Sequence, residues 1–308
     1  MFQQIELALI GAAPALIAMW TFDRLDAKRP EPRATLRLVS LGGMLAAVPI
    51  LMLAQLLAAI GPASVTGGPA GLPTTYFGAA YLAFIIAAFP EELAKLASVY
   101  AFAWRKPEFD ERMDGIAYGA RAGLGFALVE NVAYMLTLPD NLREYLALLL
   151  ARAVLVVPGH AIWGGISGYF WARRRFDGRG PGIWGGLCIA AVMHGAYDLW
   201  VFGAPVAIAR GHAWMGVMLG GLPVLVYVVP MTIVLFGAWW LRRLASLAVA
   251  LDDVAEDEGR LHSRASMAVV LPDEPAYTAE ASIAAGQVMR RSMQDMLEDS
   301  DEFPIAEP

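Results

Sequence analysis

The sequence predicts an all-α protein, a polytopic bundle of about seven transmembrane helices. Three observations support this fold class. The chain is 58% hydrophobic and only 17% charged over its 308 residues, whereas a soluble protein carries about 25% charged residues. Apolar runs of about 18 residues or more recur along the chain, and each is long enough to cross a bilayer. Basic residues gather in alternate loops, as they do in membrane proteins of fixed orientation.

The expected helices follow the apolar runs in chain order. They cover residues 5–22, 38–60, 75–104, 115–138, 146–172, 183–203 and 214–241. The residues that open the first run, MFQQIE, lack the positive charges of a signal peptide, so we expect a retained helix there. The third run contains Pro90 and is longer than a straight span requires, so we expect it to bend or tilt.

The loops predict the orientation of the chain. One set of alternate loops contains 14 basic residues, whereas the opposite set contains only Arg143 and Arg210. Short loops rich in lysine and arginine remain in the cytosol. We therefore expect the amino terminus outside the cell and the carboxyl terminus in the cytosol.

The end of the chain differs in composition from the rest. From Asp252 onward there are 14 acidic and 4 basic residues, a composition typical of solvated, disordered segments. We expect residues 1–243 to form the transmembrane domain and residues 244–308 to form an acidic, largely disordered cytosolic tail. The tail is expected to be dispensable for chemistry, either as a solubilising segment or as a partner-binding one. Cys188 is the single cysteine of the sequence, which excludes an internal disulfide and a cysteine metal cluster.

Ionisable side chains also fall inside the predicted spans. They are Glu91, Glu92, Lys95, Arg121, Glu130, Arg152, His160, His194 and Asp198. A charged group at a helix centre costs about 2.5–3.5 kcal/mol on insertion scales, so a set of this size indicates a polar interior with a function. At a rise of about 1.5 Å per residue, the glutamates, histidines and aspartate share a depth of about 16–22 Å from the cytosolic ends of their helices. Arg121 is expected to snorkel toward the cytosol, and no catalytic role is expected for Arg152.

The spacing of these residues predicts pairs on common helix faces. Lys95 follows Glu91 by four residues and Glu92 by three, and both spacings allow an ion pair. Asp198 follows His194 by four residues, so one side chain can orient the other. Small residues repeat at the same spacing in Gly119–Gly123 and Gly164–Gly168, which favours close packing of helices.

Four motifs occur in order within these spans. EELAK (Glu91–Lys95) fits EExxK, FALVE (Phe126–Glu130) fits FxxxE, and HGAYD (His194–Asp198) fits HxxxD, while HAIWGGISGY (His160–Tyr169) adds a further histidine. In this order and with these gaps they resemble the PrsW family of intramembrane proteases, which is distantly related to the CAAX prenyl endopeptidases and the ABI-type membrane proteases. The resemblance covers residues 75–203, and more weakly the chain up to residue 241.

The resemblance implies hydrolysis of a peptide bond in or beside a membrane. The family's typical substrates are single-span membrane proteins such as anti-sigma factors, cleaved to start a signalling cascade. The implied location is a bacterial-type plasma membrane, with the lipid bilayer and a single-span substrate as partners and no nucleic acid. The catalytic residues implied are Glu91, Glu92, Lys95, Glu130, His194 and Asp198, with Phe126 and His160 as additional candidates.

Two mechanisms remain open at this point. A buried glutamate is a competent base near neutral pH, so Glu91 can activate water while Glu92 and Lys95 tune its charge. Alternatively, zinc can bind, since it takes imidazole and carboxylate ligands. The candidate zinc ligands are Glu91, Glu130, His160, His194 and Asp198. The HExxH motif of many zinc peptidases is absent from the sequence.

The sequence leaves two alternatives to this site, a transporter and a serine protease. A transporter or proton-coupled carrier also uses buried acidic and basic groups, but it is often built from internal repeats, and the sequence contains no convincing repeat. The segment GISG (Gly165–Gly168) resembles a motif of rhomboid serine proteases. Ser167 is predicted to lie only about half as deep as His194, so a Ser–His pair is not favoured.

Overall fold

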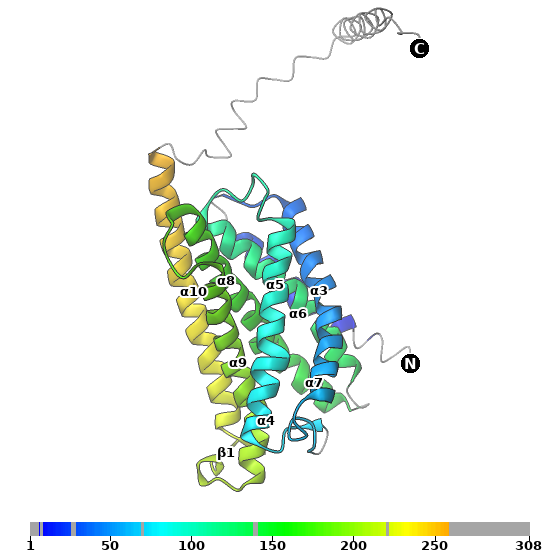
Figure 1. The fold of residues 1–308 in the computed structure, drawn as a ribbon. Helices are drawn as coiled ribbons and strands as arrows, with labels where there is room; N and C mark the ends of the chain where they lie inside the picture. The colour runs from blue at the N-terminus through cyan, green and yellow to red at the C-terminus, as the bar shows by residue number, and fades with distance from the viewer. Residues whose placement is uncertain are drawn as a thin grey trace, which may run out of the picture. The chain divides into compact units, whose positions relative to one another are not determined.

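The computed structural model describes residues 6, 9–25, 29–68, 71–137, 141–219 and 222–258. All of these belong to one of two units of the chain, Met1–Leu261. They are almost entirely helical, as expected (Figure 1). The part of the expected acidic tail that follows residue 258 lies outside the described residues.

The described residues form helical rods in the same order as the expected spans. The rods and their segments are α2 (Ala13–Leu25), α3 (Arg33–Ile60), α4 (Tyr76–Ala80) with the π-helix η2 (Tyr81–Ala88) and α5 (Phe89–Phe102), α6 (Arg112–Leu136), α7 (Leu142–Ala151) with the π-helix η3 (Arg152–Val156) and α8 (Val157–Asp177), α9 (Gly182–Ala209), and α10 (Leu225–Asp257). The first expected span begins in residues that are not described.

Four of the described helices are long and apolar enough to cross a membrane. They are α3, the continuous rod Leu142–Asp177, α9 and α10. Of the other expected spans, α2 has only 13 residues and α5 only 14. Helix α6 is long enough, but it carries the buried charged residues Arg112, Asp114, Arg121 and Glu130.

The last rod differs from the expected span 214–241 at both ends. A short 3₁₀-helix, η4 (Ala213–Met215), and an antiparallel hairpin of β1 (Met218–Leu219) and β2 (Leu222–Pro223) precede α10. Pro223 has no amide hydrogen to donate in a continuing helix, and α10 begins two residues later. At its other end α10 continues to Asp257, so the domain boundary expected after residue 243 falls inside a helix.

The final turns of α10 are bound to the start of α6. The side chain of Asp252 is fully buried, and its carboxylate accepts hydrogen bonds from the backbone amides of Arg112 and Met113 at 3.0–3.1 Å. The guanidinium of Arg112 donates to the same carboxylate at 2.7 Å and to Asp177 at 2.5 Å. A carboxylate satisfies the unpaired amides and the positive end of a helix. Asp252, which composition had assigned to the solvated tail, is therefore part of the packed structure.

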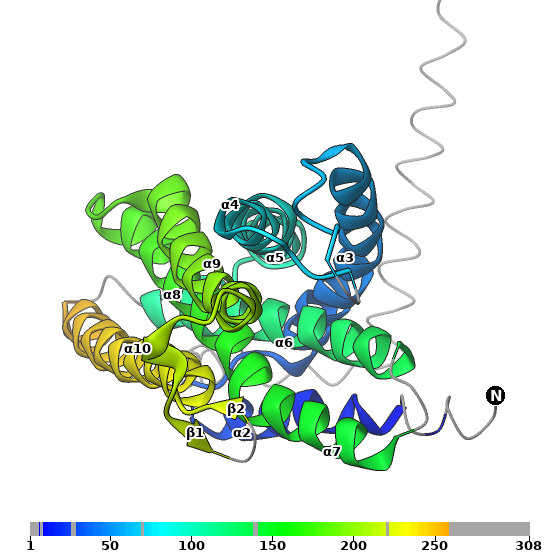
Figure 2. The same cartoon turned by 90° about the horizontal axis from the view of Figure 1, so that it is seen from below.

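Helices α6 and α8 pack against each other along facing glycines. A Cβ atom added to Gly119 would meet the backbone carbonyl of Gly164, and one added to Gly123 would meet the carbonyl of His160. The predicted close packing at these glycines is confirmed. Figure 2, a view along the helices, shows α3, α5, α9 and α10 around this central part of the bundle. The glycines therefore bring His160 directly against α6.

Candidate active site

The polar side chains expected in one layer meet inside the bundle. Helix α5 contributes Glu91, Glu92 and Lys95, α6 contributes Glu130, α8 contributes His160, and α9 contributes His194 and Asp198. All of them are buried except Asp198, which is partly exposed. The common depth that the sequence predicted thus corresponds to a common location.

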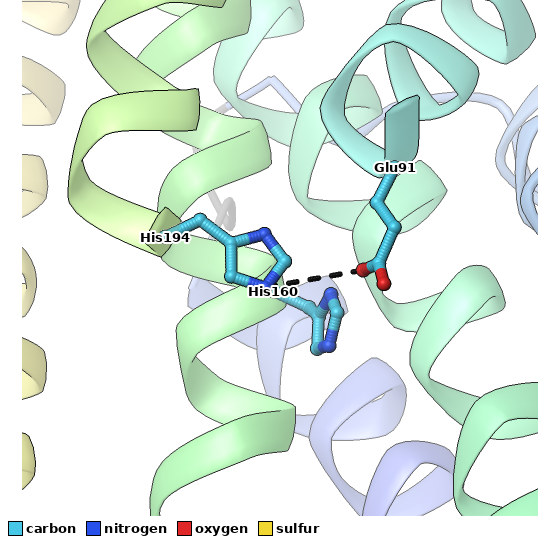
Figure 3. A group of neighbouring side chains, drawn as sticks. All are labelled: Glu91, His160 and His194. Atoms are coloured by element: carbon cyan, nitrogen blue, oxygen red, sulfur yellow. Dashed lines mark ion pairs between the residues drawn. The ribbon is translucent and has the colours of Figure 1, made fainter. Parts of the chain in front are cut away.

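Three of these residues form a compact cluster at the centre. Glu91, His160 and His194 each offer one ligand atom, and these atoms lie within 4.8 Å of one another. Figure 3 shows the three side chains converging from α5, α8 and α9. The distance from His194 Nε2 to Glu91 Oε2 is 3.9 Å. Among the described residues, neither Glu91 Oε2 nor His160 Nδ1 has a hydrogen-bond partner, so both atoms are available to a ligand.

A carboxylate and a cation stand behind His194. Its Nδ1 atom is 2.9 Å from Glu92 Oε1, and the same oxygen accepts a hydrogen bond from Lys95 Nζ at 2.6 Å. The expected ion pair of Lys95 therefore forms with Glu92, three residues before it. Asp198 also contacts this imidazole, with its Oδ2 atom 3.3 Å from His194 Nε2, as their spacing predicted.

A second carboxylate and a second cation stand behind His160. Its Nε2 atom is 2.9 Å from Glu130 Oε2, and the Arg152 guanidinium approaches the same oxygen at 2.8 Å. Arg152 Nε donates to Asn131 Oδ1 at 2.6 Å. No catalytic role was expected for Arg152, and Asn131 was not among the residues expected in the site. The only sequence signal for this contact was a charged residue inside an apolar run.

The two histidines are thus held in the same way. Glu92 lies beside Nδ1 of His194 and Glu130 lies beside Nε2 of His160, and each of these carboxylates has its own cation. A hydrogen bond at one ring nitrogen sets which nitrogen is free to bind a metal ion. The arrangement is the one that proteins use to orient histidine ligands.

The formal charge of the site also suits a divalent cation. Four carboxylates belong to it, those of Glu91, Glu92, Glu130 and Asp198, whereas its cations are Lys95 and Arg152. With neutral imidazoles the formal sum is −2, which is costly in a buried site unless a cation neutralises it. Two imidazoles and one carboxylate are a donor set that catalytic zinc takes in hydrolases. The residues present therefore fit a metal ion.

The central cluster holds three of the five candidate metal ligands. Glu130 contacts His160 and Arg152 instead, and Asp198 contacts His194. Both lie next to the Glu91–His160–His194 cluster without belonging to it.

Two π-helical segments precede the cluster along the chain. Pro90 and Pro158 cannot donate a hydrogen bond, and each ring crowds the carbonyl four residues earlier. Those earlier residues lie in η2 and η3, where the helix is wider. Glu91 follows the first proline by one residue and His160 follows the second by two. π-helical turns are frequent at functional sites, and here Glu91 and His160 follow the ends of η2 and η3 by three and four residues.

Aromatic rings enclose the imidazoles. Trp163 is stacked on His194 with ring centroids 4.2 Å apart and presents its edge to His160 at 5.7 Å. Phe126, an additional candidate from the sequence, stacks on His160 at 5.7 Å. Both aromatic side chains are fully buried. Trp163 was missed by the sequence analysis, although its place three residues after His160 puts it on the same helix face.

Ser167 lies toward another part of the site. With Glu92 and Lys95 it lines a small cavity between α5, α6 and α8 that has room of about 10 Å³ for the centre of a water molecule, which is about enough for one. Among the described residues Ser167 Oγ has no hydrogen-bond partner, so no hydrogen bond links it to His194. The geometry gives no support to a Ser–His pair.

Apolar helices long enough to cross a membrane thus enclose buried carboxylates and imidazoles, the side chains that hydrolases use as bases and metal ligands. The chain belongs to the PrsW family, because residues 31–238 match the model of the "PrsW family intramembrane metalloprotease". The protein is therefore an intramembrane peptidase and an integral membrane protein, and the resemblance and enzyme class predicted from the motifs are confirmed. The transporter alternative is not supported.

Curated relatives carry the name Protease PrsW. The one from Geobacillus kaustophilus strain HTA426 is 31% identical over 211 residues, which cover 68% of this chain and 84% of the relative. The one from Clostridioides difficile strain 630 is 28% identical over 199 residues, covering 63% of this chain and 79% of the relative. The one from Halalkalibacterium halodurans is 36% identical over 118 residues, covering 38% and 52%. No solved structure matches the chain significantly.

Proposed function

We propose that Glu91, His160 and His194 hold a divalent metal ion, zinc by the chemistry of the donors, and that this centre hydrolyses a peptide bond of a membrane protein. The observation that carries the proposal is the cluster of three converging ligand atoms. It is supported by the carboxylate behind each imidazole and by the formal charge of the surrounding groups.

The residues of the site have separate roles in this proposal. When bound, the metal ion supplies a Lewis acid that polarises the scissile carbonyl and activates water. Glu92 and Glu130 hold the imidazoles in one tautomer and one orientation. Asp198, beside His194 Nε2 at 3.3 Å, is the remaining carboxylate that can accept a proton from the attacking water and return it to the leaving amine. Phe126 and Trp163 limit the access of bulk water.

The proposed topology has all the helical rods crossing the membrane, seven in the described residues, with the amino terminus outside and the carboxyl terminus in the cytosol. It is supported by the bias of basic residues toward the loops α2–α3, α5–α6 and α8–α9. Reporter fusions after residue 258 and within the loop 137–141 test it. One reporter is chosen that works only outside the cell. If it were active when fused after residue 258, the orientation would be the reverse of the proposed one.

The proposed substrate is a single-span membrane protein of the anti-sigma-factor kind, cut toward the outer end of its span. Glu130 lies 6 residues before the end of α6, and Asp198 lies 11 residues before the end of α9, the ends assigned to the outside. A substrate helix must unwind before attack, and unwinding costs less where water replaces its backbone hydrogen bonds. Mass spectrometry of the fragments locates the bond, and a cut at the cytosolic end would contradict this placement.

Chelation tests the metal-dependent mechanism. The purified protein is reconstituted with a tagged single-span substrate, and cleavage is followed with o-phenanthroline or with the weakly chelating isomer m-phenanthroline. We expect loss of cleavage with the first alone and recovery on addition of Zn²⁺. Full cleavage by protein shown to be free of metal would instead favour the glutamate mechanism, with Glu91 as the base.

A further inference from the structure

Arg152 is a buried cation that neither the motifs nor the proposed mechanism includes. Arg152 is only 5% exposed, and it is the first residue of the π-helical segment η3. A buried arginine in an apolar helix carries a large cost unless its charge and its hydrogen-bond donors are satisfied. Its contacts therefore indicate what it does.

These contacts hold the guanidinium from several sides. Its Nη2 atom is 2.8 Å from Glu130 Oε2, and its Nε donates to Asn131 Oδ1 at 2.6 Å. The ring of Tyr134 lies 4.1 Å from Arg152 Cζ, a cation–π contact. Asn131 is itself held, because its amide nitrogen donates to the carbonyl of Gly11 at 3.2 Å. The orientation of Arg152 is thus fixed by groups that do not belong to the cluster.

The contacts of Lys95 beside His194 provide a comparison for those of Arg152 beside His160. Lys95 binds Glu92 at 2.6 Å, and Glu92 contacts His194 at 2.9 Å. Arg152 binds Glu130 at 2.8 Å, and Glu130 contacts His160 at 2.9 Å. The order cation, carboxylate and imidazole is the same on both sides, although Lys95 belongs to the EExxK motif and Arg152 to none of the four motifs.

We propose that Arg152 is a positioning residue of the active site. It holds the Glu130 carboxylate beside His160 Nε2, and His160 Nδ1 is the ring nitrogen that has no hydrogen-bond partner among the described residues. Arg152 is thereby the counterpart of Lys95 and acts through Glu130 rather than on the substrate. This inference rests on the proposed function, in which His160 and its two neighbours hold a metal ion.

Metal affinity is the first test. Zn²⁺ binding by the purified wild type and its variants is measured by competition with a chromophoric chelator. We expect Arg152→Met to weaken binding by about 10- to 100-fold, the usual effect of losing support behind a metal ligand. Arg152→Lys keeps the charge but not the planar fork, so its effect should be smaller.

The matched control is Arg121→Met. Arg121 is also a buried arginine of the bundle, 8% exposed, but it pairs with Asp23 at 3.5 Å, and we expect unchanged Zn²⁺ binding. Wild-type affinity in both Arg152 variants would overturn the proposal, as would an equal loss in Arg121→Met. If Arg152→Met fails to fold, Arg152→Lys carries the test.

A double-mutant cycle in substrate cleavage is the second test, and it needs no assumption about the metal. If Arg152 acts through Glu130, Arg152→Met should reduce kcat strongly in the wild type but much less in a Glu130→Gln background, where no carboxylate is left to hold. KM should change little in either background. Equal effects in both backgrounds would overturn the proposed route. If the wild type binds no Zn²⁺, the proposed metal fails, while the cycle still decides on Arg152 and Glu130.

Discussion

Two buried carboxylates, Asp252 and Glu91, differ in how they are satisfied. Asp252 is fully buried, and both of its oxygens accept hydrogen bonds from the start of α6. Glu91 is 7% exposed, and its Oε2 atom has no hydrogen-bond partner among the described residues. The fold thus supplies hydrogen-bond partners for both oxygens of Asp252 but leaves Glu91 Oε2 without one among the described residues.

This difference separates structural from functional charge. A buried acceptor without a partner costs about 1–3 kcal/mol, and more when it is charged, so a fold retains one where a ligand or a reaction uses it. Asp252 joins two helices and leaves nothing for a ligand. Glu91 faces two imidazoles that are oriented toward it by other carboxylates. Buried charge alone therefore does not mark the site. Buried atoms without a hydrogen-bond partner also occur elsewhere among the described residues, and the mark of the site is such an oxygen in a cluster with two imidazoles.

The largest expected effect is that of Glu91→Gln. Removing the charge from the central cluster should reduce cleavage by about 100-fold or more. In metal-free protein it should leave the unfolding temperature unchanged or raise it, because a buried charge is removed. Cleavage of a tagged substrate and thermal unfolding in detergent check both points. Wild-type activity in the variant would refute the role of Glu91.

Asp252→Asn should show the opposite pattern. It removes one partner of a buried charged pair, which typically costs about 3–5 kcal/mol. The unfolding temperature should therefore fall, while the protein that remains folded keeps its activity. An inactive variant of normal stability would break the distinction between the two carboxylates.

Truncations sharpen the same point. Deleting residues 259–308 should leave insertion, stability and cleavage unchanged, because the described contacts of α10 with α6 are made by residues before that segment. Deleting residues 252–308 should destabilise the protein, since it removes the Asp252 carboxylate. The segment expected to be dispensable therefore begins at residue 259 rather than at Asp252. Equal stability of the two truncated proteins would contradict this.

A smaller effect is expected where α6 meets α8. Gly164→Ala places a methyl group against the backbone carbonyl of Gly119, and such overpacking typically costs about 1–3 kcal/mol. Gly165→Ala is the matched control, because its methyl group meets the movable side chain of Leu241 at 3.1 Å. Gly164→Ala should therefore have a lower unfolding temperature than Gly165→Ala, and cleavage is measured for both variants. Equal tolerance would refute the close contact.

The order of the helices could be predicted from the apolar runs, whereas their local shape could not. The π-helical turns depend on how Pro90 and Pro158 are accommodated within long helices, and the prolines alone do not distinguish a bend from a widened turn. The end of α10 depends on a contact between Arg112 and Asp252, which are 140 residues apart in the chain. Composition assigned Asp252 to the tail because it cannot detect such a contact.

The members of the candidate site were largely predictable, and their partners were not. The depth of the acidic and imidazole groups along the predicted spans placed them in one layer. Which carboxylate faces which imidazole depends on the rotation of α5, because Glu91 and Glu92 are adjacent and point about 100° apart on a helix. Trp163 was missed and Arg152 was given no catalytic role, because an aromatic or charged residue in a helix has no assigned partner until the helices are packed.

The metal content of the purified protein tests the central claim most directly. We expect about one divalent metal ion per chain in the wild type, as for a single catalytic centre. His160→Ala and His194→Ala should lose the ion, whereas Asp252→Asn should keep it in the folded fraction. Active wild-type protein that contains no metal, or full metal content in both histidine variants, would contradict the proposed centre.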